Sequence, residues 1–81
     1  MSESRKIPDR EPDLVVPKVS WYYSWSLWYD EKLVVIHRHG EDQVLSEYSS
    51  MQVINRTLNN EEDPQRKILV DYIADKELLD L

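Results

Sequence analysis

The sequence contains no cysteine, no phenylalanine and a single glycine, Gly40. Without cysteine the chain forms neither a disulfide bond nor a thiolate metal site, which fits a reducing compartment. Without a glycine-rich stretch it has no phosphate-binding loop of the kind found in many nucleotide-binding enzymes. Large apolar side chains must therefore stabilise this short chain.

Long hydrophobic runs are also missing. The longest strictly apolar run, Leu33–Ile36, is far too short to cross a bilayer. Residues 1–13 lack the apolar segment of a signal peptide. We therefore expect no membrane partner, and a place in the cytosol or in a host cytosol to which the protein is delivered.

A basic stretch is missing as well, and the net charge is −6. Residues 1–18 carry four basic and four acidic side chains, so the whole excess of negative charge lies in residues 19–81. Phosphate backbones repel such a domain, and we expect no direct binding to nucleic acid. A larger protein with a basic surface is the better electrostatic partner.

What the chain does have is a concentration of aromatic residues. The segment SWYYSWSLWY, residues 20–29, holds all three tryptophans and three of the five tyrosines. At strand spacing one face is entirely apolar, which predicts a strand over residues 19–29 with that face buried: Val19, Trp21, Tyr23, Trp25, Leu27 and Tyr29.

The remaining pattern predicts further strands and two helices. Turns at residues 30–32 and 40–42 separate strands at 33–39 and 43–48. A helix follows from about Ser49, with Ser49 or Ser50 as its N-cap. A second helix spans Pro64–Leu79, with Asp63 as its N-cap and proline at its first position. The fold class is therefore α+β, a small antiparallel β-hairpin or three-stranded meander followed by two helices, and residues 19–81 form one domain.

Residues 1–18 have the composition of a flexible tail. Three prolines interrupt them, charged residues alternate in sign, and the first apolar cluster is Leu14–Val16. A solvated tail is the preferred interpretation. A short edge strand or a docking segment at residues 14–16 is the alternative.

The most site-like motif is HRHGED, residues 37–42. On a strand His37 and His39 share a face, and two imidazoles with a carboxylate suit a divalent transition metal. The His-x-His pair is similar to that of the cupins, but the following glutamate is too close and a second half-motif is missing. We treat both histidines as weak metal candidates and expect no cofactor.

Catalytic patterns are scarce. None of the serines lies in a nucleophile-elbow motif. The carboxylates of residues 61–63 have no apolar neighbours in sequence to raise a pKa, as acid–base catalysis needs. We expect a protein that is not an enzyme.

Two aromatic residues remain on the otherwise polar face of the predicted strand. Tyr22 and Trp28 flank Ser24 and Ser26 there, and tryptophan and tyrosine are enriched in protein-binding surfaces. The predicted partner-binding residues are thus Tyr22, Trp28, Leu14, Val15 and Val16. Three alternatives stay open: the tail covers this face, a bend moves Trp28 into the core, or the face mediates self-association.

These features predict a small non-catalytic regulator or inhibitor that docks on a larger protein through an aromatic sheet face. A viral accessory protein acting on host machinery such as RNA polymerase would fit this description. One alternative is an acidic decoy that mimics nucleic acid, through Glu61, Glu62, Asp71 and Asp75. The other is a structural subunit that forms homodimers or larger assemblies.

Overall fold

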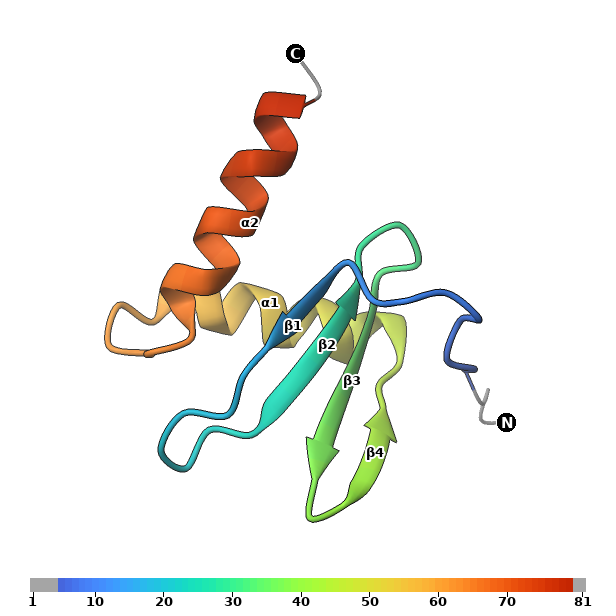
Figure 1. The fold of residues 1–81 in the computed structure, drawn as a ribbon. Coiled ribbons are helices and arrows are strands. Elements are labelled where there is room, and N and C mark those ends of the chain that lie inside the picture. Colours follow the sequence, from blue (N-terminus) through green and yellow to red (C-terminus); the bar gives the residue numbers. More distant parts are fainter. Residues whose placement is uncertain (1–4, 80–81) are drawn as a thin grey trace.

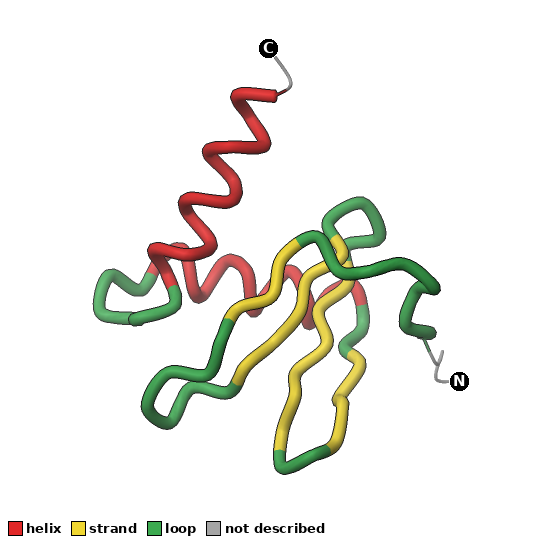
Figure 2. Tube along the Cα trace, viewed as in Figure 1, coloured by secondary structure: helices red, strands yellow, loops and turns green. Residues whose placement is uncertain are grey.

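A computed structural model describes residues 5–79 of the chain. It contains a four-stranded antiparallel sheet in the order β1-β2-β3-β4, followed by two helices (Figures 1 and 2). The elements are β1 (Leu14–Val16), β2 (Ser24–Trp28), β3 (Leu33–Arg38), β4 (Glu41–Val44), α1 (Glu47–Asn59) and α2 (Arg66–Leu79). The predicted α+β class is confirmed, and neither helix in this described part of the chain is long and apolar enough to cross a membrane.

The sheet has one strand more than predicted, and that strand comes from the segment assigned to a flexible tail. Strand β1 pairs antiparallel with β2, with Val16 opposite Trp25. The preferred interpretation of a solvated tail is therefore corrected for residues 14–16, which form the edge strand of the alternative. Residues 1–4 lie outside the described residues.

The predicted strand over residues 19–29 is too long. Only residues 24–28 belong to β2, because the chain reverses earlier in a tight turn. Val19 and Tyr22 exchange two backbone hydrogen bonds of 3.1 and 2.8 Å, and Ser20 between them has a φ of 54°. Residues 19–23 therefore do not continue the strand-like alternation of side chains that residues 24–28 show.

Strands β3 and β4 are joined by a two-residue turn. His39 and Gly40 have φ values of 52° and 80°, and positive φ at both central positions matches the twist of a tight hairpin. Because the turn is so short, β4 starts at Glu41 rather than at the predicted residue 43.

Both helices begin at polar caps. Ser46, not Ser49 or Ser50, caps α1, since its Oγ accepts a hydrogen bond from the Ser49 N–H at 3.1 Å. Ser50 is buried instead, and its Oγ accepts the Val34 N–H at 2.9 Å beside the end of β4. Before α2, the Asp63 side chain accepts the Gln65 N–H at 2.8 Å, which is the capping role predicted for this aspartate.

The main core lies between the sheet and both helices, with α1 running behind the sheet in Figure 1. Its fully buried members come from β1, β2, β3 and α2: Val16, Trp25, Leu27, Val34 and Leu69. Burying an aliphatic side chain of this kind contributes about 1.5–3 kcal/mol. A second, smaller cluster lies on the opposite sheet face and consists of Trp28, Leu33, Val35 and Val44.

Candidate protein-binding site

Trp28, predicted to lie on an open sheet face, is buried. It is 4% exposed and belongs to the cluster opposite the helices. Its indole Nε1 donates a hydrogen bond to the backbone carbonyl of Arg10 at 3.0 Å. The prediction that Trp28 is accessible to a partner is therefore wrong. Trp28 stays paired with Leu33 in the sheet, and the segment before β1 covers its side chain.

Side-chain contacts fasten that segment to the turn between β2 and β3. Arg10 forms ion pairs with Asp13, at 3.0 Å, and with Glu31. Asp13 also accepts the Tyr29 N–H at 2.7 Å. The hydrogen bond from Arg10, and then the one from Tyr29, hold the pKa of Asp13 below its ordinary value, although partial desolvation opposes them.

The predicted docking segment at residues 14–16 is mostly structural. Leu14 and Val16 pack into the helix-side core, and Val16 is completely buried. Val15 faces the other side and is exposed. Two of these three residues are therefore corrected from docking residues to core residues, and only Val15 is accessible.

An accessible aromatic surface lies at the hairpin tip, the loop of residues 17–23 that joins β1 and β2. Trp21 is 76% exposed, although the strand pattern predicted it to be buried. Its ring stacks on Tyr22, with centroids 5.7 Å apart and ring planes inclined by 23°. Tyr22, which is half-buried, has Trp21 and not Trp28 as its aromatic neighbour.

Gln65 anchors the hairpin tip to the start of α2. Its side-chain Nε2 donates to the backbone carbonyls of Pro17 and Tyr23 at 3.0 and 2.9 Å, and its Oε1 accepts from the Trp25 indole at 3.1 Å. Gln65 is only 3% exposed. Because both ends of the tip are hydrogen-bonded to this one buried amide, the loop that carries Trp21 and Tyr22 is held in position.

An apolar hollow of about 190 Å³ lies beside the tip, between the sheet and α1. We call it the aromatic groove, and its lining includes Tyr22, Tyr23, Trp25, Ile36, Val53 and Arg56. The Arg38 guanidinium lies 5.4 Å above the Tyr23 ring, and Asp63 also lines the groove. The groove thus combines an apolar floor with two nearby arginines.

The two histidines do not form a metal site. His37 points to Ser26 and Asp42, whereas His39 turns its ring toward Tyr23, with centroids 5.6 Å apart. The prediction that both share a face is wrong, because the chain reverses at His39. Residues 5–79 contain no group of three or more His, Cys, Asp or Glu side chains that could hold a metal ion.

His37 lies instead in a hydrogen-bonded chain that sequence reasoning missed. Its Nε2 is 2.8 Å from Ser26 Oγ and its Nδ1 is 2.7 Å from Asp42 Oδ1. An ionised carboxylate only accepts, so Nδ1 donates to Asp42, and in the tautomer with its proton on Nδ1 the His37 Nε2 accepts from the serine hydroxyl. The bonding order resembles that of a serine hydrolase.

Burial argues against catalysis by this chain of residues. Ser26 is 4% exposed in the middle of β2, so a substrate carbonyl cannot reach its hydroxyl. The three side chains come from three adjacent strands, in which Ser26 faces Val35 and His37 faces Asp42. Their role in this geometry is to tie β2, β3 and β4 together on one sheet face. These three residues are separated in the sequence, and only the strand register shows that they meet.

The predicted acidic surface is divided between two elements. Glu61 and Glu62 lie exposed in the loop before α2, while Asp71 and Asp75 lie exposed on α2 itself. Asp71 pairs with Lys67 one turn earlier at 3.5 Å. An array that imitates a phosphate backbone needs closely spaced, unneutralised charges, and this arrangement supplies few of them.

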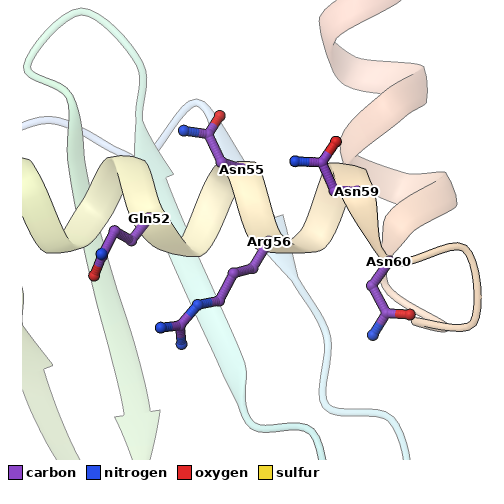
Figure 3. Close-up of a pocket in the computed structure, with 5 residues that line it drawn as sticks. All are labelled: Gln52, Asn55, Arg56, Asn59 and Asn60. Carbon is purple, nitrogen blue, oxygen red and sulfur yellow. The ribbon is translucent and has the colours of Figure 1, made fainter.

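A shallow hollow of about 450 Å³ lies on the exposed side of α1 (Figure 3). We call it the amide hollow, and it is lined by Gln52, Asn55, Arg56, Asn59 and Asn60. Arg56 lines both this hollow and the aromatic groove. The two depressions therefore meet at one arginine.

Comparisons with models of protein families, with curated proteins and with solved structures found no match to this chain. The function must therefore be argued from the geometry.

Proposed function

We propose that this chain is a small non-catalytic regulator or inhibitor that docks on a larger protein through the hairpin tip. The observation that carries the proposal is the exposure of Trp21, 76%, on a tip that the buried Gln65 amide holds in place. Tyr22, stacked on Trp21, completes the contact surface.

The choice of this surface follows from the energetics of interfaces. Tryptophan and tyrosine supply large contact areas, lose little conformational entropy and are enriched among residues that dominate binding energies. A small domain that leaves an indole in water gives up the stabilisation that its burial would bring. Burial against a partner recovers that stabilisation.

The local charges define the partner's chemistry. The net charge of −6 favours a basic partner for the molecule as a whole. Close to the tip, Lys18, Arg38 and Arg56 lie with Asp63, and Glu41 and Asp42 lie beside Arg38 in the β3–β4 hairpin. Charges act mainly within a Debye length, about 8 Å at physiological ionic strength. We therefore expect the partner surface to present an apolar pocket for Trp21, with side chains of both charges beside it.

A purified binding pair tests the proposal. Partners are captured from a lysate of the source cell or of its host, and the dissociation constant of each purified candidate is measured for wild type and for Trp21→Ser. Loss of about 2 kcal/mol, roughly thirtyfold in affinity, is expected for a dominant contact. Tyr48→Ser is the matched control, because Tyr48 is 74% exposed. It lies at the N-terminal end of α1, whereas Arg56, beside the hairpin tip, lies near the C-terminal end of that helix. Equal affinity of wild type and Trp21→Ser overturns the proposal.

The same assay separates the alternatives. Charge reversal at Asp71 and Asp75 weakens an acidic decoy and leaves docking through the hairpin tip unchanged. A sedimentation coefficient that rises with protein concentration and returns to the monomer value in Trp21→Ser identifies a self-associating subunit.

A further inference from the structure

The side chains of the amide hollow stand in two rows along α1. Figure 3 shows Asn55 and Asn59 pointing to one side of the helix, and Gln52, Arg56 and Asn60 pointing to the other. Neighbours within each row are four residues apart, the spacing that places side chains above one another on a helix. Side chains of both rows line the hollow.

Asn60 caps α1 and its Oδ1 accepts the Glu62 N–H at 3.1 Å, and Asn59 ends the helix, but helix stability does not explain Asn55. Asparagine is among the weaker helix formers, below lysine, glutamate and glutamine. Asn55 is nevertheless exposed in the middle of α1, where it makes no contribution to the core. The exposed face of α2, by contrast, carries charged side chains such as Lys67 and Asp71. The neutral amide of Asn55 thus needs a reason other than helix propensity or capping.

Their spacing fits an extended peptide. Side chains at positions i and i+4 are about 6 Å apart along a helix axis. Alternate residues of an extended chain are about 6.6–6.8 Å apart. Each amide side chain offers donors and an acceptor and can therefore pair with both the C=O and the N–H of a peptide backbone. Two rows of this kind can hold a strand laid between them.

The charge of the hollow selects among peptides. Arg56 is the one charged residue among the five that line it, and none of them is a carboxylate. A guanidinium in this position pairs well with a carboxylate, in a fork that can hold both oxygens. Because Arg56 also lines the aromatic groove, a peptide in the hollow continues directly toward Tyr22.

We infer that the amide hollow binds an extended, carboxylate-bearing peptide segment of the partner protein, with its backbone paired to Asn55 and Asn59 and its acidic side chain paired to Arg56. This inference rests on the proposed function, since the segment belongs to the partner that receives Trp21. It adds the class of ligand and a second set of contacts.

A random peptide library displayed on phage, selected against the full chain, supplies the probe. Enriched peptides are synthesised, and their dissociation constants are measured for wild type, for Asn55→Ala/Asn59→Ala and for Arg56→Gln. Alanine and glutamine are good helix formers, so both variants keep α1 folded. The expected outcome is a set of acidic peptides whose affinity falls about tenfold or more in each variant. In NMR spectra, the side-chain NH₂ signals of both asparagines shift when the peptide is added.

Three outcomes overturn the inference: no enriched peptide, peptides without a carboxylate, or affinities that neither variant changes. Partner binding by Trp21→Ser and by Asn55→Ala/Asn59→Ala then shows whether the proposed function fails as well. If Trp21→Ser abolishes partner binding and Asn55→Ala/Asn59→Ala does not, the hairpin tip docks alone and only the peptide site is refuted. If Trp21→Ser leaves partner binding intact, the proposed function itself fails.

Discussion

The indole of Trp28 donates a hydrogen bond to the backbone carbonyl of Arg10, 3.0 Å away, so the chain before β1 closes over the sheet face opposite the helices. This contact turns a face that would otherwise be open into a second small core. The exposed tryptophan is Trp21 at the hairpin tip, not Trp28 in the sheet.

Replacement of Trp28 should therefore be costly. We expect Trp28→Ala to lower the free energy of unfolding by about 3–5 kcal/mol, since it leaves a cavity in the small cluster. Trp28→Phe removes the hydrogen bond and leaves the Arg10 carbonyl without its indole donor, for a loss of about 1 kcal/mol. Urea unfolding followed by circular dichroism measures both values. Trp21→Ala serves as the exposed control, and equal stability of Trp28→Ala and Trp21→Ala would contradict the burial of Trp28.

Gln65 should control the order of the hairpin tip. Gln65→Met keeps the size of the side chain but leaves the Trp25 indole and two backbone carbonyls without their partner. We expect a loss of about 2–3 kcal/mol in stability and faster amide hydrogen exchange in residues 17–23. The matched control is Gln52→Met on the exposed side of α1, for which a change within about 0.5 kcal/mol is expected. Unchanged exchange in Gln65→Met would show that the tip holds its shape without this amide.

The bonds among Ser26, His37 and Asp42 should appear as coupling between mutations. Ser26→Ala and His37→Ala remove the same hydrogen bond, so their effects on stability should fall short of additivity by about 1 kcal/mol. A double-mutant cycle in urea measures this coupling energy. Additive effects would mean that the serine and the imidazole do not interact in solution.

Ser26 should also be chemically inert. A fluorophosphonate reagent labels serines that are both activated and accessible, and the 4% exposure of Ser26 denies it access. We expect mass spectrometry of the intact folded protein to show no adduct. Stoichiometric labelling that disappears in His37→Ala would instead identify an acyl-transfer site and refute the non-catalytic role.

Asp13 should make stability depend on pH in the acid range. Its folded-state pKa is lowered, first by the hydrogen bond from Arg10. A lowered pKa stabilises the fold at pH values above the unfolded-state pKa, about 3.9, and this contribution is lost as the pH falls through the folded-state value. The stability difference between wild type and Asp13→Asn should therefore be largest near neutral pH and shrink below about pH 4. The control is Asp9→Asn at an exposed position. A stability difference between wild type and Asp13→Asn that is constant with pH would contradict the lowered pKa of Asp13.

Local pattern was sufficient for much of the fold. The sequence pattern predicted a strand at residues 33–39 and helices from about Ser49 and over Pro64–Leu79, where the structure has β3, α1 and α2. Asp63 was recognised as a cap because capping depends on residues only two or three positions apart. These signals lie within one or two turns of chain, so the sequence alone contains them.

The candidate site depended on contacts between distant residues. Alternation along a strand separates two faces, but it does not tell which segment covers each face. Trp21 and Trp28 exchanged their predicted environments because a turn at Ser20 ended the strand early and the segment around Arg10 covered Trp28.

The sequence by itself determined the α+β class, the two helices, the acidic charge and the fact that aromatic side chains must stabilise the domain. Only the tertiary structure decided which aromatic residues remain in water. It also decided that His37 meets Ser26 and Asp42 rather than His39, and that Arg56 joins two hollows on the surface. The physical reason is that propensity and periodicity act over a few residues, whereas burial and side-chain pairing are set by strand register and by packing between segments far apart in the chain.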